Sequence, residues 1–276
     1  MRSVHHRICC LSSKACKVFI TYALVFFVGQ SIMAKPTEFH WQDTGYIEKS
    51  FYNIVLDSEY ERLSPVVRKW NQPLRVWMSS QAGNGRQQAH YLTQHFHQLS
   101  KITGLPIHFV PIAKQANVRV YFAEGAELKH IASREMSSVA VNNLSHSYCL
   151  GQIRFNRKAE ITRGTVVVDV AKSEANQKLL PCIVEELTQM LGVINDSAAV
   201  HPTIFSDISN EDFLTGLDYL LLKLLYSPQV KAGMRAEQLS PILQDQLEEW
   251  EQAGVIHRAD LILRSQSMAL ATRYVR

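Results

Sequence analysis

The segment CIVEELTQMLGVIND, residues 182–196, places the strongest constraint on what this chain can fold into. At 100° per residue, its apolar side chains fall on one broad stripe of an amphipathic helix. The stripe consists of Ile183, Val184, Leu187, Met190 and Leu191. The segment therefore predicts a helix that packs one face against a core and presents a polar face elsewhere.

The polar face of this helix has a spacing that is typical of a binding or active site. Glu185 and Gln189 are four residues apart, so their side chains lie on adjacent turns, and Glu186 is next to them. Gly192 predicts a turn that ends the helix, and we expect Asn195 to fold back toward the same face. The competing interpretation is a solvated helix face without a special role.

Strands are expected together in the first half of the chain and helices in the second, which predicts an α+β fold. After an irregular lead-in at 35–72, the expected strands cover 74–79, 105–112, 117–124, 151–156 and 164–170. The expected helices cover 86–104, 179–193, 213–226 and 236–252. Residues 125–148 are polar and are expected to be irregular. The pattern after residue 252 does not favour one type of secondary structure.

The N-terminus predicts export. Residues 1–34 combine a basic start, a short apolar run at 18–29 and a small-residue exit at Ala34, which is the pattern of a cleaved signal peptide. The apolar run is short for a membrane span, which needs about 20 residues. We therefore expect a periplasmic or secreted protein without a stable membrane span. The alternative is an uncleaved signal anchor in the inner membrane.

Cleavage would change the charge and cysteine content. The leader carries four of the 29 Lys and Arg residues, which leaves 25 against 25 acidic residues, so nothing favours nucleic acid as a partner. It also removes three of the five cysteines and leaves Cys149 and Cys182. An exported chain with an even pair predicts a disulfide, and two free buried thiols are the alternative.

Together with its surroundings, the segment EELTQMLGVIN resembles the metzincin branch of the zinc peptidases, the zincins. Their HExxHxxGxxH pattern binds zinc through three histidines, and its glutamate activates a water. At the corresponding positions this chain keeps Glu186 and Gly192 but has Glu185, Gln189 and Asn195 as the metal-position equivalents. In HPTIFSD, Phe205 stands where metzincins have the methionine of a turn, and the helix ending in Leu-Tyr follows.

The chain also resembles an uncharacterised bacterial family of exported proteins that is known only as a domain of unknown function. The resemblance rests on a Cys before an EELTQ-type helix, the following Asn-Asp, and the stretch LLYSPQVKAGM.

The resemblance to metzincins implies a zincin-like domain at 73–228, with a mixed twisted sheet, a long first helix and an active-site-type helix. A helical C-terminal extension at 229–276 would follow.

The three altered positions favour an inactive site. Zinc prefers imidazole and thiolate ligands, and the amides of Gln189 and Asn195 are poor substitutes. Asp196, His201 and Asp207 are near in sequence and are candidates to complete a site for another divalent metal. His90, His95 and His97 on the first long helix are expected to be an exposed polar face.

Three functions stay open at this point. The first is a divergent, non-proteolytic exported protein of unknown role, with no cofactor. The second is an active hydrolase with an altered metal site, in which Glu186 is the general base. The third is a non-catalytic module that binds a peptide or a component of the cell envelope.

Overall fold

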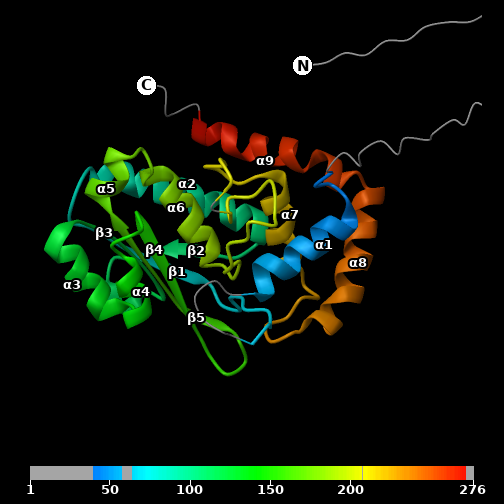
Figure 1. Ribbon diagram of the computed structural model, residues 1–276, viewed down its shortest axis with the longest axis horizontal. Helices are drawn as coiled ribbons and strands as arrows, with labels where there is room; N and C mark the ends of the chain where they lie inside the picture. The colour runs from blue at the N-terminus through cyan, green and yellow to red at the C-terminus, as the bar shows by residue number, and fades with distance from the viewer. Residues whose placement is uncertain (1–39, 58–63, 207, 272–276) are drawn as a thin grey trace, which may run out of the picture. The chain divides into compact units, whose positions relative to one another are not determined.

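The computed structural model, which describes residues 40–57, 64–206 and 208–271, contains a five-stranded mixed sheet, seen on the left side of Figure 1. The order is β2-β1-β3-β5-β4. The strands are β1 (Leu74–Ser80), β2 (Ile107–Phe109), β3 (Val118–Ala123), β4 (Cys149–Phe155) and β5 (Ile161–Asp169). Neighbouring strands are parallel except at one edge, where β4 runs antiparallel to β5. The predicted mixed sheet is confirmed.

Alternating side chains of the central strands enter two separate apolar clusters. On β3, Val120 and Phe122 belong to the larger cluster, whereas Tyr121 and Ala123 belong to the smaller one. This period of two follows from the pleat of a strand. Because helices cover both faces, the central strands carry buried apolar side chains on both faces over part of their length, as in residues 120–123 of β3. The clearest sequence signal of the sheet, GTVVVDV, covers the second part of β5, where residues 164–168 are buried, and it ends one residue beyond the strand.

Two helices cover one face of the sheet and two cover the other. Helices α2 (Gly85–Thr103) and α6 (Leu179–Gln189) contribute to the larger cluster, and α3 (Gly125–Glu135) and α4 (Ser138–Asn143) pack against the smaller one. Asn84 caps the start of α2 by accepting hydrogen bonds from the backbone of its first turn. The predicted Gly stop of this helix is confirmed at Gly104, with φ of 74°.

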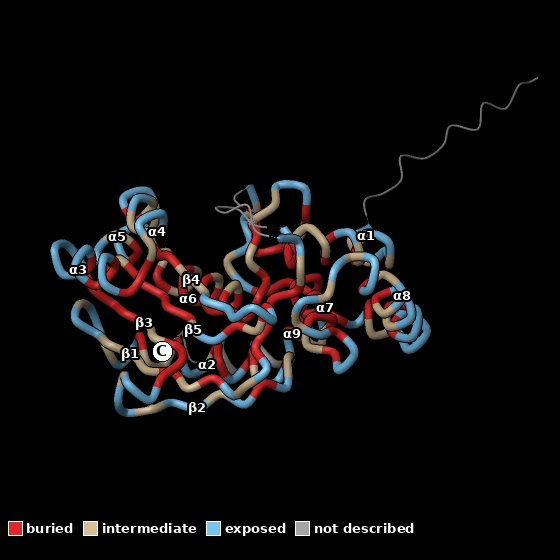
Figure 2. Tube along the Cα trace, turned by 90° about the horizontal axis from the view of Figure 1, so that it is seen from below, coloured by how far each residue is buried: buried red, intermediate tan, exposed pale blue. Residues whose placement is uncertain are grey.

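The described residues form seven further helical segments, most of which contribute buried side chains to the larger cluster. They are α1 (Thr44–Phe51), the π-helix η1 (Tyr52–Leu56), the 3-10 turn η2 (Ala113–Gln115), α5 (Val170–Ala175), α7 (Gly216–Leu225), α8 (Ala236–Gln252) and α9 (Val255–Ala271). Of these, α1, α7, α8 and α9 pack together, and buried segments run through both the sheet and this helical part (Figure 2). The segments before residue 73 and after residue 228 therefore share one core with the middle of the chain.

The structure corrects the expected grouping of strands and helices. Residues 125–143 form α3 and α4 instead of an irregular stretch, and α9 occupies the ambiguous tail. Helices thus alternate with strands along the first half, so the fold is α/β and not α+β. The error arose because α3 is polar overall, and it buries only a narrow stripe that includes Leu128, Ile131 and Ala132.

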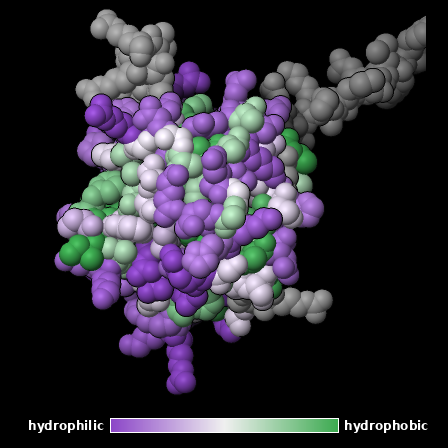
Figure 3. Space-filling model, turned by 90° about the vertical axis from the view of Figure 1, so that its left-hand side faces the viewer, coloured by the Kyte–Doolittle hydropathy of each residue, from purple (hydrophilic) through white to green (hydrophobic). Residues whose placement is uncertain are grey.

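The outer side of the sheet half is mainly hydrophilic. The face seen in Figure 3 is interrupted only by smaller hydrophobic areas, as is usual for a protein surface. Among the described residues, no helix is both long and apolar enough to cross a membrane. The predicted signal peptide at 1–34 lies outside the described residues.

Candidate functional site

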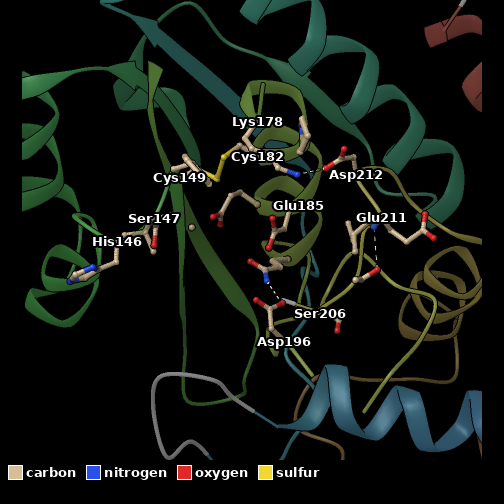
Figure 4. Close-up of a pocket in the computed structure, with 18 residues that line it drawn as sticks. His146, Ser147, Cys149, Lys178, Cys182, Glu185, Asp196, Ser206, Glu211 and Asp212 are labelled. Carbon is tan, nitrogen blue, oxygen red and sulfur yellow. Dashed lines mark hydrogen bonds and ion pairs between the residues drawn. A yellow bond between two sulfur atoms is a disulfide. The ribbon is translucent and has the colours of Figure 1, made fainter. Parts of the chain in front are cut away.

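The two faces of α6 meet different surroundings. Ile183 and Leu187 are buried in the larger apolar cluster, as the amphipathic pattern predicts. Glu185, Glu186 and Gln189 line a cavity on the other side of the helix (Figure 4). The helix therefore positions a row of polar side chains from a rigid, well-packed base.

The cavity has a volume of about 380 Å³, which is within the usual range for small-molecule and side-chain pockets. Its walls come from the segment before and within β4, from α6, and from the segment between α6 and α7. The lining residues include His146, Ser147, Cys149, Gly151, Lys178, Cys182, Glu185, Glu186, Gln189, Asp196, Ser206, Glu211 and Asp212.

A disulfide joins two walls of this cavity. Cys149 and Cys182 are bonded with an S–S distance of 2.04 Å and a Cα–Cα distance of 5.9 Å, so the predicted pairing is confirmed. The bond fastens the start of β4 to the first turn of α6. A buried structural disulfide is typical of an oxidising compartment outside the cytoplasm.

Glu186 lies against β4 because the strand has no side chain there. A Cβ built on Gly151 would be 2.5 Å from Oε2 of Glu186, which is closer than real contacts allow. The Glu186 side chain is only 7% exposed, yet it lines the cavity. Gly151 is therefore the feature that lets a carboxylate sit between the helix and the edge strand, and the sequence did not suggest it.

The structure brings Asp196, and not Asn195, to the polar face of α6. The Gln189 side chain donates a hydrogen bond of 2.8 Å to Oδ1 of Asp196, as Figure 4 shows. The side chain of Asn195 instead donates to the backbone oxygen of Asn53, at 2.9 Å, and does not line the cavity. The expectation that Asn195 returns to the site was wrong by one residue, because a backbone oxygen of η1 accepts from this amide and orients it away from the cavity.

Gly192 makes the predicted turn at the end of α6. Its φ is 113°, and a Cβ would collide with the backbone oxygen of Arg68. The turn carries the chain toward a segment whose Phe205, fully buried, sits in the apolar core. Phe205 therefore holds the segment in place, and its neighbours Ile204 and Ser206 line the cavity.

A buried carboxylate, Asp218, holds the segment between α6 and α7 through several hydrogen bonds. Asp218 accepts hydrogen bonds from the Thr203 hydroxyl, from the Ile204 N–H at 3.2 Å and from the Thr215 N–H at 2.8 Å. It also completes a capping box with Thr215 at the start of α7. Burial raises the pKa of Asp218 to about 6, although the hydrogen bonds oppose this effect.

The histidines proposed from the sequence are not part of the cavity wall. His95 is buried behind α6, where its Nε2 lies 2.9 Å from the Thr188 hydroxyl. Burial lowers the pKa of His95 to about 4, so the ring is neutral at pH 7. The expectation that it lies on an exposed face was wrong, whereas His97 is exposed. His201 bonds to the Ala198 backbone oxygen through its own ring, at 2.9 Å.

The donor set does not fit a catalytic zinc. Asn195 points away, and Gln189 is bonded to Asp196. Among the residues that the structure describes, no group of three or more His, Cys, Asp or Glu side chains is arranged to hold a metal ion. Asp207 lies outside the described residues. We therefore assign no step to a metal at this site.

Several lining residues were not found from the sequence. Lys178 and Asp212 form an ion pair of 2.7 Å across the mouth of the cavity, and Ser206 and Glu211 come from the same segment as Asp212. No local pattern marks these side chains, since the fold alone brings the segment opposite α6.

Comparison with protein families identifies the group to which the chain is related. A family described as "Protein of unknown function (DUF2927)" matches residues 44–245, which is most of the chain. The chain belongs to the DUF2927 family. The match spans α1 through most of α8 and includes every residue of the candidate site. A comparison with curated proteins found no match.

Proposed function

We propose that this DUF2927 protein is an exported, non-proteolytic member of a zincin-like group that binds an extended peptide in the periplasm or outside the cell. The support for a zincin-like core is the element order β1, α2, further strands and α6, followed by the Gly192 turn and α7. The placement of Asn195 away from the site is the main departure from that pattern.

The observation that carries the proposal is the open edge of β4 beside α6. The Asp169 N–H donates to the Tyr148 oxygen, and Leu150 pairs with Val167. Since backbone groups alternate in direction along an antiparallel strand, those of Cys149 and Gly151 point away from β5. Both residues line the cavity. An added peptide strand would bond to these groups and place a side chain over α6.

A matched pair of substitutions at one position tests this binding mode. Gly151→Ala adds a Cβ that displaces the Glu186 carboxylate but keeps the N–H, whereas Gly151→Pro adds the same Cβ within a larger ring and removes the N–H. Pro is tolerated on an edge strand where the N–H faces outward. The full sequence would be expressed in a bacterium, and the purified protein would be applied to an array of short random-sequence peptides.

We expect the wild type and Gly151→Ala to capture a common set of peptides, and Gly151→Pro to bind them about tenfold more weakly. Equal binding by both variants would overturn the strand-addition mode. A wild-type protein that captures no peptide would overturn the proposed function.

An altered hydrolase is the second candidate, because Glu186 reaches the cavity next to the same strand edge. In that case Glu186 would be the general base for a water molecule in the cavity. Elemental analysis of the purified protein, with peptide hydrolysis by the wild type and Glu186→Gln, separates the two candidates. Cleavage that disappears in Glu186→Gln would favour the hydrolase over the non-proteolytic protein.

A further inference from the structure

The charged side chains of the cavity are predominantly acidic. Among the described residues that line it, five carboxylates face one lysine and one histidine. The acidic residues are Glu185, Glu186, Asp196, Glu211 and Asp212. The lysine, Lys178, is paired with Asp212, and each is about half exposed. Carboxylates from three separate parts of the chain thus converge on one space, although the calculated net charge of the whole chain is positive.

A buried hydroxyl on the same wall gives an independent sign of a ligand. The Ser206 side chain is 6% exposed, and its Oγ has no hydrogen-bond partner among the described residues. A buried polar group without a partner costs free energy, so it calls for an explanation such as a bound water, ion or ligand, and Ser206 is the one such group, among those of the described residues, that lines this cavity. Ser206 lines the cavity, where a ligand that donates a hydrogen bond would satisfy its oxygen.

The size of the cavity favours a side chain over a bare ion. A volume of about 380 Å³ is far larger than an ion requires, and the described acidic residues are not grouped closely enough to coordinate a metal. A lysine ammonium offers three donors and an arginine guanidinium five, on a long apolar stem. Such a group can reach acceptors on several walls at once.

We infer that the cavity is a specificity pocket for a basic side chain, lysine or arginine, of the bound peptide. This inference rests on the proposed peptide binding at β4. The outward backbone of Cys149 and Gly151 would hold the peptide main chain, and Glu185, Asp196 and Ser206 would surround the cationic group. The pocket would disfavour acidic side chains by like-charge repulsion.

Three fluorescein-labelled peptides test the inference with the full chain. Each alternates valine and threonine, and the central residue is lysine, glutamine or glutamate. Fluorescence polarisation would measure their affinities for the wild type, for Glu185→Gln and for Ser206→Ala. Glu237→Gln is the matched control, because it removes the same charge from an exposed position on α8, away from the cavity.

We expect the lysine peptide to bind about tenfold more tightly than the glutamine peptide and the glutamate peptide to bind most weakly. Glu185→Gln should reduce the preference for lysine, and Ser206→Ala should reduce it less. The preference should also shrink as salt is added, whereas Glu237→Gln should retain it.

The outcomes separate the two proposals. Equal binding of all three peptides, still weakened by Gly151→Pro, would overturn the basic-side-chain pocket and leave peptide binding intact. Absence of binding by every peptide would overturn both. A preference for lysine that Glu237→Gln reduces as much as Glu185→Gln would show a general charge effect, and it would overturn the assigned pocket.

Discussion

Thr188 and Gln189 are neighbours on α6, yet their side chains meet opposite surroundings. The Thr188 hydroxyl is fully buried, bonds to the Val184 backbone oxygen at 2.5 Å and contacts the ring of His95. Gln189 lines a cavity that contains several carboxylates and reaches only across to Asp196. Polar groups behind the helix are therefore buried against the core, whereas those in front of it face a cavity.

The disulfide joins two walls of the cavity in front of α6. Its removal should cause the largest loss of stability among the changes considered. Cys149 and Cys182 are 33 residues apart in sequence, and closing a loop of that length stabilises by about 3–4 kcal/mol. We expect the double variant Cys149→Ser/Cys182→Ser to lose about that much stability in urea unfolding. The wild type under reducing conditions is the control, and a loss below about 1 kcal/mol would contradict a structural role.

Stability should depend on pH because His95 is buried behind α6, beside Thr188. Its folded pKa of about 4 is below the ordinary value of 6.5, because burial disfavours the charged ring. The contribution of the neutral ring to the free energy of unfolding is therefore fully present above pH 6.5 and is lost as the pH falls through 4. The loss should total about 3 kcal/mol, at 1.36 kcal/mol per pKa unit.

The variant His95→Gln isolates this effect from other titrating groups. Asp218 acts in the opposite sense, because its pKa is raised to about 6, so its contribution is lost as pH rises through that value. We expect the stability of the wild type minus that of His95→Gln to increase between pH 4 and 6.5, measured by urea unfolding. A difference that does not vary with pH would show that the His95 ring is not held neutral by burial.

A single charged side chain on the cavity side of α6 should tolerate substitution with little change in stability. Glu185 is only partly buried, and we expect Glu185→Gln to change the free energy of unfolding by less than about 0.5 kcal/mol. The same variant should weaken binding of the lysine peptide. A large loss of stability in Glu185→Gln would remove the distinction between the two faces.

The local features of α6 could be predicted from sequence because each depends on neighbouring residues. The spacing of Ile183 and Leu187 indicates a buried stripe, and Gly192 indicates a turn with positive φ. The pairing of Cys149 with Cys182 was predicted because an exported chain with two cysteines outside the leader favours a disulfide over two free thiols. The succession of the main strands along the chain was also predicted, because segments such as the VVV of β5 are runs of branched apolar residues, but their order in the sheet was not predicted.

What the sequence determined by itself was a polar row on an amphipathic helix, a turn after it and a disulfide beside it. The tertiary structure decided which distant groups face that row. One residue separates Asn195 from Asp196, and only the position of η1 directs the first inward and leaves the second in the cavity. The tertiary structure also decides that Gly151 and Ser206 line the cavity. Contacts between residues far apart in sequence depend on packing, which no local periodicity encodes.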